Sequence, residues 1–297
     1  MGKTDSKYRG HFNKYHKTMK FSEIILKDIS YFTLSMKNYF RNGFKHKSIL
    51  VHPHYPSRGS TIYKVGKKMN YNITNKPCKS IQFGVAWEYL TFREEFHLLK
   101  VLSKTKPVVN LYSRDISKIF IDGVHQEIFG YCTIVDPLTF KGKIVRKNDI
   151  NAVHDGAILQ GPLDTIEKGY IYQILIDNAT PDDLVMDIRV PIVKEMLDFV
   201  YIKHRSISER FTNSTVTSTI AATNTLFSTE EIALINKYCA ALKLEYGELD
   251  VLRNKDDNKI YVVDVNNTPQ GPPANTSKTD GELVLSKIAT ALQSLTD

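Results

Sequence analysis

The chain has 297 residues, 42% of them hydrophobic, so it is long enough to fold as one large or two ordinary domains with buried cores. Its 40 Lys and Arg exceed its 32 Asp and Glu, and the resulting net charge of +8 would attract an anionic ligand. Three widely spaced cysteines and the lack of a long apolar run argue against a disulfide framework, a membrane span and a secretory signal, so a cytoplasmic setting is expected.

Residues 1–44 are expected to be a basic tail followed by a helix. The opening residues match the Met-Gly-x-x-x-Ser pattern of N-myristoylation at Gly2. So short a pattern has many accidental matches, and a membrane is not expected as a partner. Residues 21–40 carry apolar side chains that predict a helix packed on the body of the protein. These side chains are Ile24, Ile25, Ile29, Phe32, Leu34 and Met36.

Residues 45–112 have the pattern of a small parallel α/β domain. Short apolar strands are expected at residues 49–52, 81–86 and 107–110, with helices at 60–69 and 92–103. Strands that alternate with helices are typical of parallel sheets, because a parallel connection must return from one end of the sheet to the other.

Residues 113–178 begin with an expected amphipathic helix at 115–129 and then become rich in strands. Those strands are expected at residues 131–135, 143–147, 157–159 and 170–176. Together with the preceding domain, they predict a mixed α/β protein.

Residues 179–297 continue with expected strands at 187–192 and 199–203. A helix at 228–243 follows, and Ser228 and Glu231 form the capping-box pattern at its start. A loop rich in Pro, Gly, Asn and Thr precedes a closing helix at 281–295.

Acidic side chains occupy an expected hairpin formed by residues 249–252 and 260–266. Residues two apart on a strand point the same way, so Asp250 is expected beside Asp264 and Asn266 on one face. Hard oxygen ligands without Cys or His are typical of a Mg²⁺ site that also holds nucleotide phosphates. The alternative is a solvated hairpin, although an unpaired charge within apolar strands would be costly.

This hairpin resembles the final strand pair of the ATP-grasp superfamily, in particular of carboxylate-amine ligases of the glutathione-synthetase and ribosomal-protein glutamate-ligase type. Its sequence is GELDVLRNKDDNKIYVVDVNNTPQGPP, with Asp264 where the family usually has Glu. The resemblance spans roughly residues 108–273 and depends on the order of several motifs. It implies an α+β ATP-grasp fold, in which the small N-terminal parallel domain precedes two α+β subdomains that clasp ATP.

In the terms of that family, residues 113–178 would be the smaller subdomain with a phosphate flap, and residues 179–297 the subdomain with the metal site. The implied cofactors are ATP and Mg²⁺, with Mn²⁺ as a substitute. The run YIYQILID resembles the strand that enters the adenine-binding linker. The residues that this implies for adenine binding are Gln173, Ile174, Leu175 and Ile176.

Two further stretches resemble segments near the reacting centre. MDIRVPIV would direct Arg189 toward the phosphates or an acyl phosphate, and YIKHRSISERFTN would supply a basic pair, an Arg and an Asn. The second stretch nominates Lys203, Arg205, Arg210 and Asn213. The alternative for Arg189 is a structural ion pair with Asp187, which lies on its own face of the strand.

The stretch GKIVRKNDINAVHDG resembles the strand and flap that cover the triphosphate. Lys147 is expected to be the main phosphate lysine and Lys143 the second, because alternate residues of a strand share a face. Gly156 is the flap glycine in this interpretation. The alternative is a strand whose lysines face water.

The resemblance implies a ligase that forms an amide or peptide bond through an acyl phosphate, with small-molecule or peptide carboxylates and amines as substrates. Two alternatives remain open. One is a kinase of the same fold that phosphorylates a small-molecule hydroxyl, and the other is a non-catalytic protein that binds a nucleotide or nucleic acid. A nucleic-acid partner is not expected, and a homo-oligomer stays open.

Overall fold

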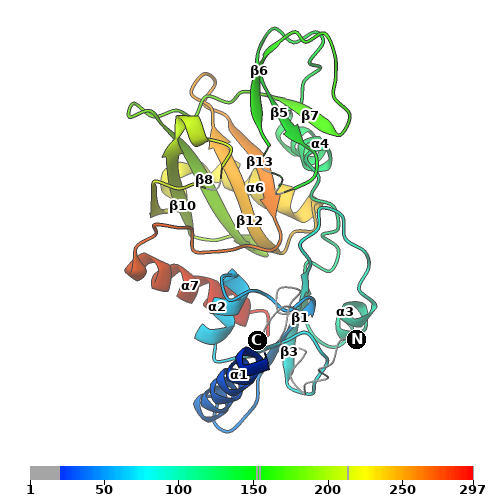
Figure 1. Cartoon of the computed structure of the whole chain (residues 1–297), viewed down its shortest axis with the longest axis vertical. Helices are drawn as coiled ribbons and strands as arrows, with labels where there is room; N and C mark the ends of the chain where they lie inside the picture. The colour runs from blue at the N-terminus through cyan, green and yellow to red at the C-terminus, as the bar shows by residue number, and fades with distance from the viewer. Residues whose placement is uncertain (1–20, 152, 154, 213, 297) are drawn as a thin grey trace.

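The computed structural model describes residues 21–151, 153, 155–212 and 214–296. Its strands form three sheets, which follow one another along the long axis of the molecule (Figure 1). A four-stranded parallel sheet lies at one end, a six-stranded antiparallel sheet in the middle and a three-stranded antiparallel sheet at the other end. The expected mixed fold with a small N-terminal parallel α/β domain is therefore confirmed.

The parallel sheet has the strand order β2-β1-β3-β4 and packs against α2. Its elements are β1 (Ser48–Pro53), α2 (Thr61–Lys68), β2 (Asn72–Thr74), β3 (Ile81–Trp87), α3 (His97–Leu102) and β4 (Val108–Val109). A Cβ at Gly66 would lie 2.6 Å from Ile73 Cδ1, so glycine allows α2 to approach the sheet closely. The expected helix at residues 92–103 begins only at His97, because Phe92 pairs with Asp115 in a β-bridge.

Helix α1 (Phe21–Arg41) forms where the sequence predicts a helix, and it contacts the body at β2. Leu34 and Met36 are half-buried, whereas Ile25, Ile29 and Phe32 are 43%, 56% and 56% exposed. The helix therefore packs on the body as expected, but several of its apolar side chains remain exposed, because helical periodicity identifies an apolar face without saying what covers it.

The three-stranded sheet has the order β6-β5-β7 and follows helix α4. Its elements are α4 (Lys118–Phe129), β5 (Gly142–Asn148), β6 (Ala157–Gly161) and β7 (Tyr170–Ile174). The strand expected at residues 131–135 does not form. Instead, the Asp122 carboxylate accepts hydrogen bonds from the backbone N–H groups of Thr133 (2.8 Å) and Ile134 (3.1 Å), which holds this segment against α4.

The six-stranded sheet has the order β11-β10-β8-β12-β13, with β9 paired to β8. Its strands are β8 (Leu184–Val193), β9 (Glu195–Met196), β10 (Phe199–Ser206), β11 (Thr217–Ala222), β12 (Tyr246–Arg253) and β13 (Ile260–Asn266). The helices of this part are α5 (Thr223–Leu226), α6 (Thr229–Ala241) and α7 (Lys278–Gln293). The capping box of Ser228 and Glu231 is confirmed at the start of α6.

The two faces of this large sheet have different neighbours. One face packs against α4 and α6 through apolar residues such as Ile188, Val190 and Leu249. On the other face, Phe199, Tyr201 and Tyr246 belong to the core shared by α2, α7 and the parallel sheet. The remainder of that face carries charged side chains, which line a pocket.

Asn110 ties the N-terminal domain to the large sheet. Its side-chain oxygen accepts hydrogen bonds from the backbone N–H groups of Glu245 and Tyr246, both at 2.9 Å, and its amide nitrogen donates to Tyr246 O at 2.5 Å. Its φ of +60° is one that asparagine tolerates better than most residues. These bonds fix the position of the parallel sheet beside β12.

Candidate functional site: a charged pocket between two sheets

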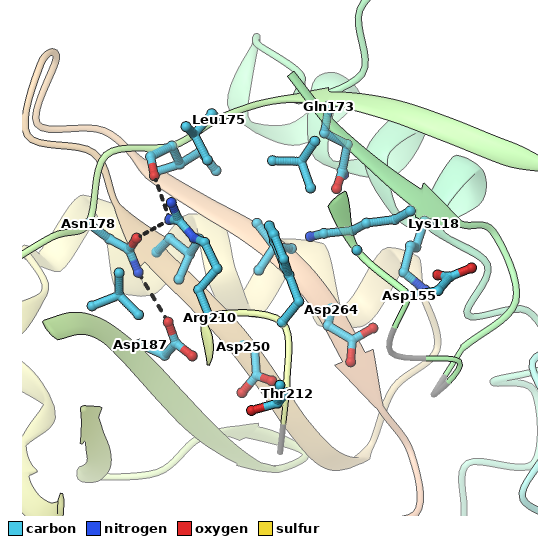
Figure 2. A pocket seen from close by; sticks show the side chains of 18 of the residues that line it. Lys118, Asp155, Gln173, Leu175, Asn178, Asp187, Arg210, Thr212, Asp250 and Asp264 are labelled. Carbon is cyan, nitrogen blue, oxygen red and sulfur yellow. Dashed lines mark hydrogen bonds between the residues drawn. The ribbon is translucent and has the colours of Figure 1, made fainter. Parts of the chain in front are cut away.

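The pocket lies between the three-stranded sheet and the charged face of the six-stranded sheet (Figure 2). Strands β5 and β7 supply one wall, and β8, β10, β12 and β13 supply the other. Cationic, acidic and apolar side chains all line it. A pocket with an apolar part and a highly charged part suits a ligand such as a nucleotide, which has an apolar base and an anionic tail.

A row of polar residues crosses four strands of the large sheet. Arg189 on β8 lies opposite Tyr201 on β10 and opposite Asp250 on β12, and Asp250 lies opposite Asp264 on β13. Residues directly opposite each other on neighbouring strands share a face. The structure therefore places Asp250 and Asp264 side by side at the pocket, as expected. A β-bulge between Asp250 and Val251 shifts the register, so Asp250 lies opposite Asp264 rather than Val263.

Arg189 forms a two-pronged ion pair with Asp250. Arg189 Nε donates to Asp250 Oδ1 at 2.9 Å, and Nη2 donates to Oδ2 at 3.0 Å. Burial tends to raise the pKa of Asp250, but the Arg189 guanidinium outweighs burial and lowers it. Arg189 is thus half of an ion pair, but its partner is Asp250. The alternative partner, Asp187, instead pairs with Arg205 at 2.6 Å.

Asp264 has an unused acceptor in the pocket. Its Oδ1 atom is buried and has no hydrogen-bond partner within the described part of the chain, and burial raises its pKa. An unpaired buried carboxylate oxygen is costly unless something neutralises it. A divalent cation fits this position, since Mg²⁺ binds through one or two carboxylates together with phosphate oxygens and water. Each Asp250 oxygen keeps a second lone pair beyond its bond to Arg189, so it can also be a ligand.

Asn266 is placed differently from the two aspartates. It lies opposite Glu248 on β12, and its Oδ1 atom accepts a hydrogen bond from the backbone N–H of Thr268 at 2.9 Å. It is not among the residues that line the pocket. In the described residues, no three His, Cys, Asp or Glu side chains form a cluster suited to a metal.

Lysines reach the pocket from three different elements: Lys118 from α4, Lys147 from β5 and Lys203 from β10. Burial lowers the pKa of Lys147 to about 8, and burial also lowers the pKa of Lys203, which is 5% exposed. Lysines drawn out of water in this way favour an anionic partner. Lys143 is exposed and does not line the pocket.

Lys118 was not singled out by the sequence. It opens α4, is 9% exposed, and its Nζ atom donates to Ile150 O at 3.3 Å. The sequence shows it only as a polar residue of an amphipathic helix. Its role at the pocket depends on how α4 sits beside β13, which no local pattern specifies.

The linker expected to receive adenine runs from Gln173 to Ile176 along one wall of the pocket. The backbone N–H groups of Ile174 and Leu175 already donate to Thr133 O and Lys143 O, at 2.8 and 3.3 Å. The Gln173 side-chain oxygen is buried and lacks a hydrogen-bond partner among the described residues. It is therefore a fitting acceptor for the exocyclic amino group of a base.

Arg205 and Arg210 line the pocket but also hold its wall together. Arg210 Nη2 donates to Asn178 Oδ1 at 2.7 Å and to Ile176 O at 3.2 Å, and Asn178 Nδ2 donates to Asp187 Oδ1 at 3.1 Å (Figure 2). These bonds connect the end of the linker to β8. Asn213, the last nominated residue of this segment, lies outside the described residues.

Gly156 lies in close contact with Phe211 at the pocket. A Cβ at this position would lie 2.7 Å from Cγ of Phe211, so any other residue would force the two segments apart. Gly156 and Phe211 both line the pocket. The flap glycine thus serves close packing against the segment that carries Arg210.

Glu248 is a further residue that the sequence did not reveal. It is 2% exposed, both of its carboxylate oxygens lack a hydrogen-bond partner within the described chain, and burial raises its pKa to about 7. Its Oε2 atom lies 3.6 Å from Arg189 Nη1. Arg189 therefore lies between two carboxylates, Asp250 and Glu248, which keeps its positive charge at this edge of the pocket.

Over most of the chain, the structure resembles solved structures of ATP-grasp ligases. The ATP-grasp ligase PsnB, in complex with a phosphomimetic variant of its minimal precursor, Mg and ADP, aligns over 85% of this chain and 100% of its own, with a TM-score of 0.55 and 11% identity. D-alanine–D-alanine ligase from Bacillus anthracis, complexed with ATP, aligns over 85% of this chain and 97% of its own, with a TM-score of 0.53 and 16% identity. No protein-family model and no curated protein sequence matches the chain. The architecture and these two likenesses together establish that the chain has the ATP-grasp fold.

Proposed function

We propose that the protein is an ATP-dependent ligase that joins a carboxylate to an amine. The observation that carries the proposal is the position of Asp250 and Asp264 on one wall of a pocket that Lys118, Lys147 and Lys203 also line. Such a pocket can hold a triphosphate between a metal at the two aspartates and the ammonium groups of these lysines. The ATP-grasp fold of the chain supports this assignment.

In the proposed reaction, a substrate carboxylate oxygen attacks the terminal phosphorus of ATP, and ADP leaves with the electrons of the broken bond. An amine then attacks the carbonyl carbon of the acyl phosphate, loses a proton, and expels inorganic phosphate. A bound Mg²⁺ ion would supply charge neutralisation at the phosphates. Asp264 and Asp250 would hold that ion, with Asn266 as a third candidate at the end of β13.

The residues of the chain have separate tasks in this scheme. Lys147 and Lys203 would bind phosphate oxygens, and their fixed positions in a partly dry pocket make them more effective than the same groups in water. Gln173 would orient the base. Arg189, held by Asp250 and Glu248, would keep a positive charge where the acyl phosphate forms.

Thermal stabilisation by ATP with Mg²⁺ is the first test. A panel of amino acids and short peptides is then screened for ADP release, and the products are identified by mass. The proposal requires an amide and one inorganic phosphate for each ADP, with a hydroxamate when hydroxylamine replaces the amine. A stable phosphoester would instead identify a kinase. ATP binding that is lost in Asp264→Asn, with no turnover on any substrate pair, would leave only a nucleotide-binding function.

A further inference from the structure

Helix α1 presents an apolar stripe to solvent. The exposed side chains recur at intervals of three and four residues, so they share one face of the helix. They are Ile25 (43% exposed), Leu26 (67%), Ile29 (56%), Phe32 (56%) and Phe40 (59%), and Phe44 (66%) extends them just beyond the helix end. We refer to these six residues as the α1 stripe. A group of exposed apolar side chains of this kind is typical of a surface that binds a protein, a ligand or a membrane.

Polar contacts help to fix the other side of α1. The buried Asn38 donates from Nδ2 to Asn72 Oδ1 at 2.9 Å, and Asn72 donates back to Ser35 Oγ at 3.1 Å. Asn42 donates to Asn70 O at 2.7 Å. These bonds orient the helix so that its polar edge meets the body and the α1 stripe faces outward. A helix that served only the protein's own core would have the opposite orientation.

Positive charge lies on the same described segment. Residues 21–47 contain five Lys and Arg but only two Asp and Glu, whereas residues 48–297 contain 29 of each sign and are neutral overall. An apolar helix face on a basic segment combines two properties, and its partner must satisfy both.

We propose that α1 and the basic residues of positions 21–47 bind the surface of an anionic lipid bilayer, with the α1 stripe inserted among the lipids. Acidic headgroups attract the basic residues, and the acyl boundary receives the apolar side chains. A second copy of the chain fits less well, because two surfaces that each carry this charge repel. Nucleic acid would satisfy the charge but leaves the α1 stripe in water.

This mode of attachment needs no membrane-spanning helix, and none of the described helices is long and apolar enough to be one. The N-myristoylation pattern at Gly2 lies outside the described residues, and binding through α1 does not require it. Figure 1 shows α1 at the opposite end of the molecule from the three-stranded sheet that covers the pocket, so binding through α1 leaves the pocket open.

The test is sedimentation of the full chain with vesicles of phosphatidylcholine alone and of phosphatidylcholine with phosphatidylserine. We expect binding only to the vesicles that contain phosphatidylserine, and weaker binding at high salt. The double variant Ile29→Glu and Phe32→Glu should reduce that binding at least tenfold. Both side chains are already more than half exposed, so the variant should fold, which its thermal unfolding would verify.

Leu283→Glu on α7 is the control for each single exchange, because Leu283 is also exposed (46%) and the change removes one apolar side chain and adds one charge. It should bind anionic vesicles like the original chain. Equal binding of the double variant, or no binding to anionic vesicles at low salt, would overturn the proposal. So would a dimer in solution, or a complex with a short duplex DNA, that forms without vesicles and is lost in the double variant.

Discussion

Asp250 and Asp264 face each other across β12 and β13, yet Arg189 is hydrogen-bonded to only the first of them. The two carboxylates therefore differ in their chemistry. Asp250 is held in its ionised form by a neighbouring guanidinium, whereas burial raises the pKa of Asp264 and leaves one of its oxygens unpaired. A bound cation would therefore stabilise the ionised form of Asp264 more than that of Asp250.

Replacing Asp264 by Asn should weaken ligand binding without destabilising the fold. The neutral amide removes an unpaired buried charge, so we expect the free energy of unfolding without ligand to stay the same or rise. Stabilisation by ATP with Mg²⁺ should be lost, with affinity lowered at least tenfold. Thermal unfolding with and without ATP and Mg²⁺ measures both effects. Asp256→Asn in the exposed turn of the same hairpin is the control and should behave like the original chain.

Breaking the pair between Arg189 and Asp250 should be costly for the fold itself. Arg189→Met leaves the Asp250 carboxylate without its partner, and we expect the free energy of unfolding to fall by about 3 kcal/mol. The double variant with Asp250→Asn should recover part of that loss, since no uncompensated charge remains. Urea unfolding of the two single variants and the double variant measures the coupling. Strictly additive losses would show that the pair does not stabilise the protein.

Lys147 and Lys143 lie on the same strand, but only Lys147 lines the pocket. Lys147→Met should weaken ATP binding by about tenfold or more, as expected for the loss of a hydrogen bond to a charged group. Lys143→Met should change the affinity by less than about twofold, because an exposed lysine outside the pocket contributes little. Titration calorimetry of both variants compares them directly. Equal losses of affinity in the two variants would mean that the phosphates lie nearer to Lys143, at the start of β5.

His125 should make the protein less stable in acid. Its ring is fully buried and stacks on the ring of Phe129, with 4.3 Å between the ring centroids. Its Nδ1 atom is 2.9 Å from Tyr131 O. Burial lowers its pKa, so the unfolded chain takes up a proton more readily than the folded protein. Stability due to this residue is therefore present above pH 6.5 and falls as the pH drops below that value.

The measurement is urea unfolding of the original chain and of His125→Phe between pH 8 and pH 5. The variant loses a hydrogen bond and should be less stable at pH 8. Because phenylalanine cannot be protonated, the difference between the two proteins should shrink toward pH 5. A difference that stays constant or grows with acidity would show that His125 is not held in its neutral form.

Local patterns determine part of this molecule. The capping box at Ser228 marks the start of α6, because its hydrogen bonds lie within four residues. The alternation of side chains along the last hairpin led to the expectation that Asp250 and Asp264 share a face, but a β-bulge between Asp250 and Val251 sets the register that pairs them. The ATP-grasp fold could be inferred because its motifs occur in a fixed order along the chain.

Contacts between distant segments decided the rest. No local pattern indicates that Asp250, 61 positions away, is the partner of Arg189. Nor does one indicate that Lys118 lines the pocket or that Glu248 lies beside Arg189. Periodicity also identified the apolar face of α1 but not its direction, which the bonds between Asn38 and Asn72 set. A side chain's local pattern fixes which way it points from its own element. The residues that this side chain contacts depend on how elements far apart in the chain pack together, and only the tertiary structure contains that information.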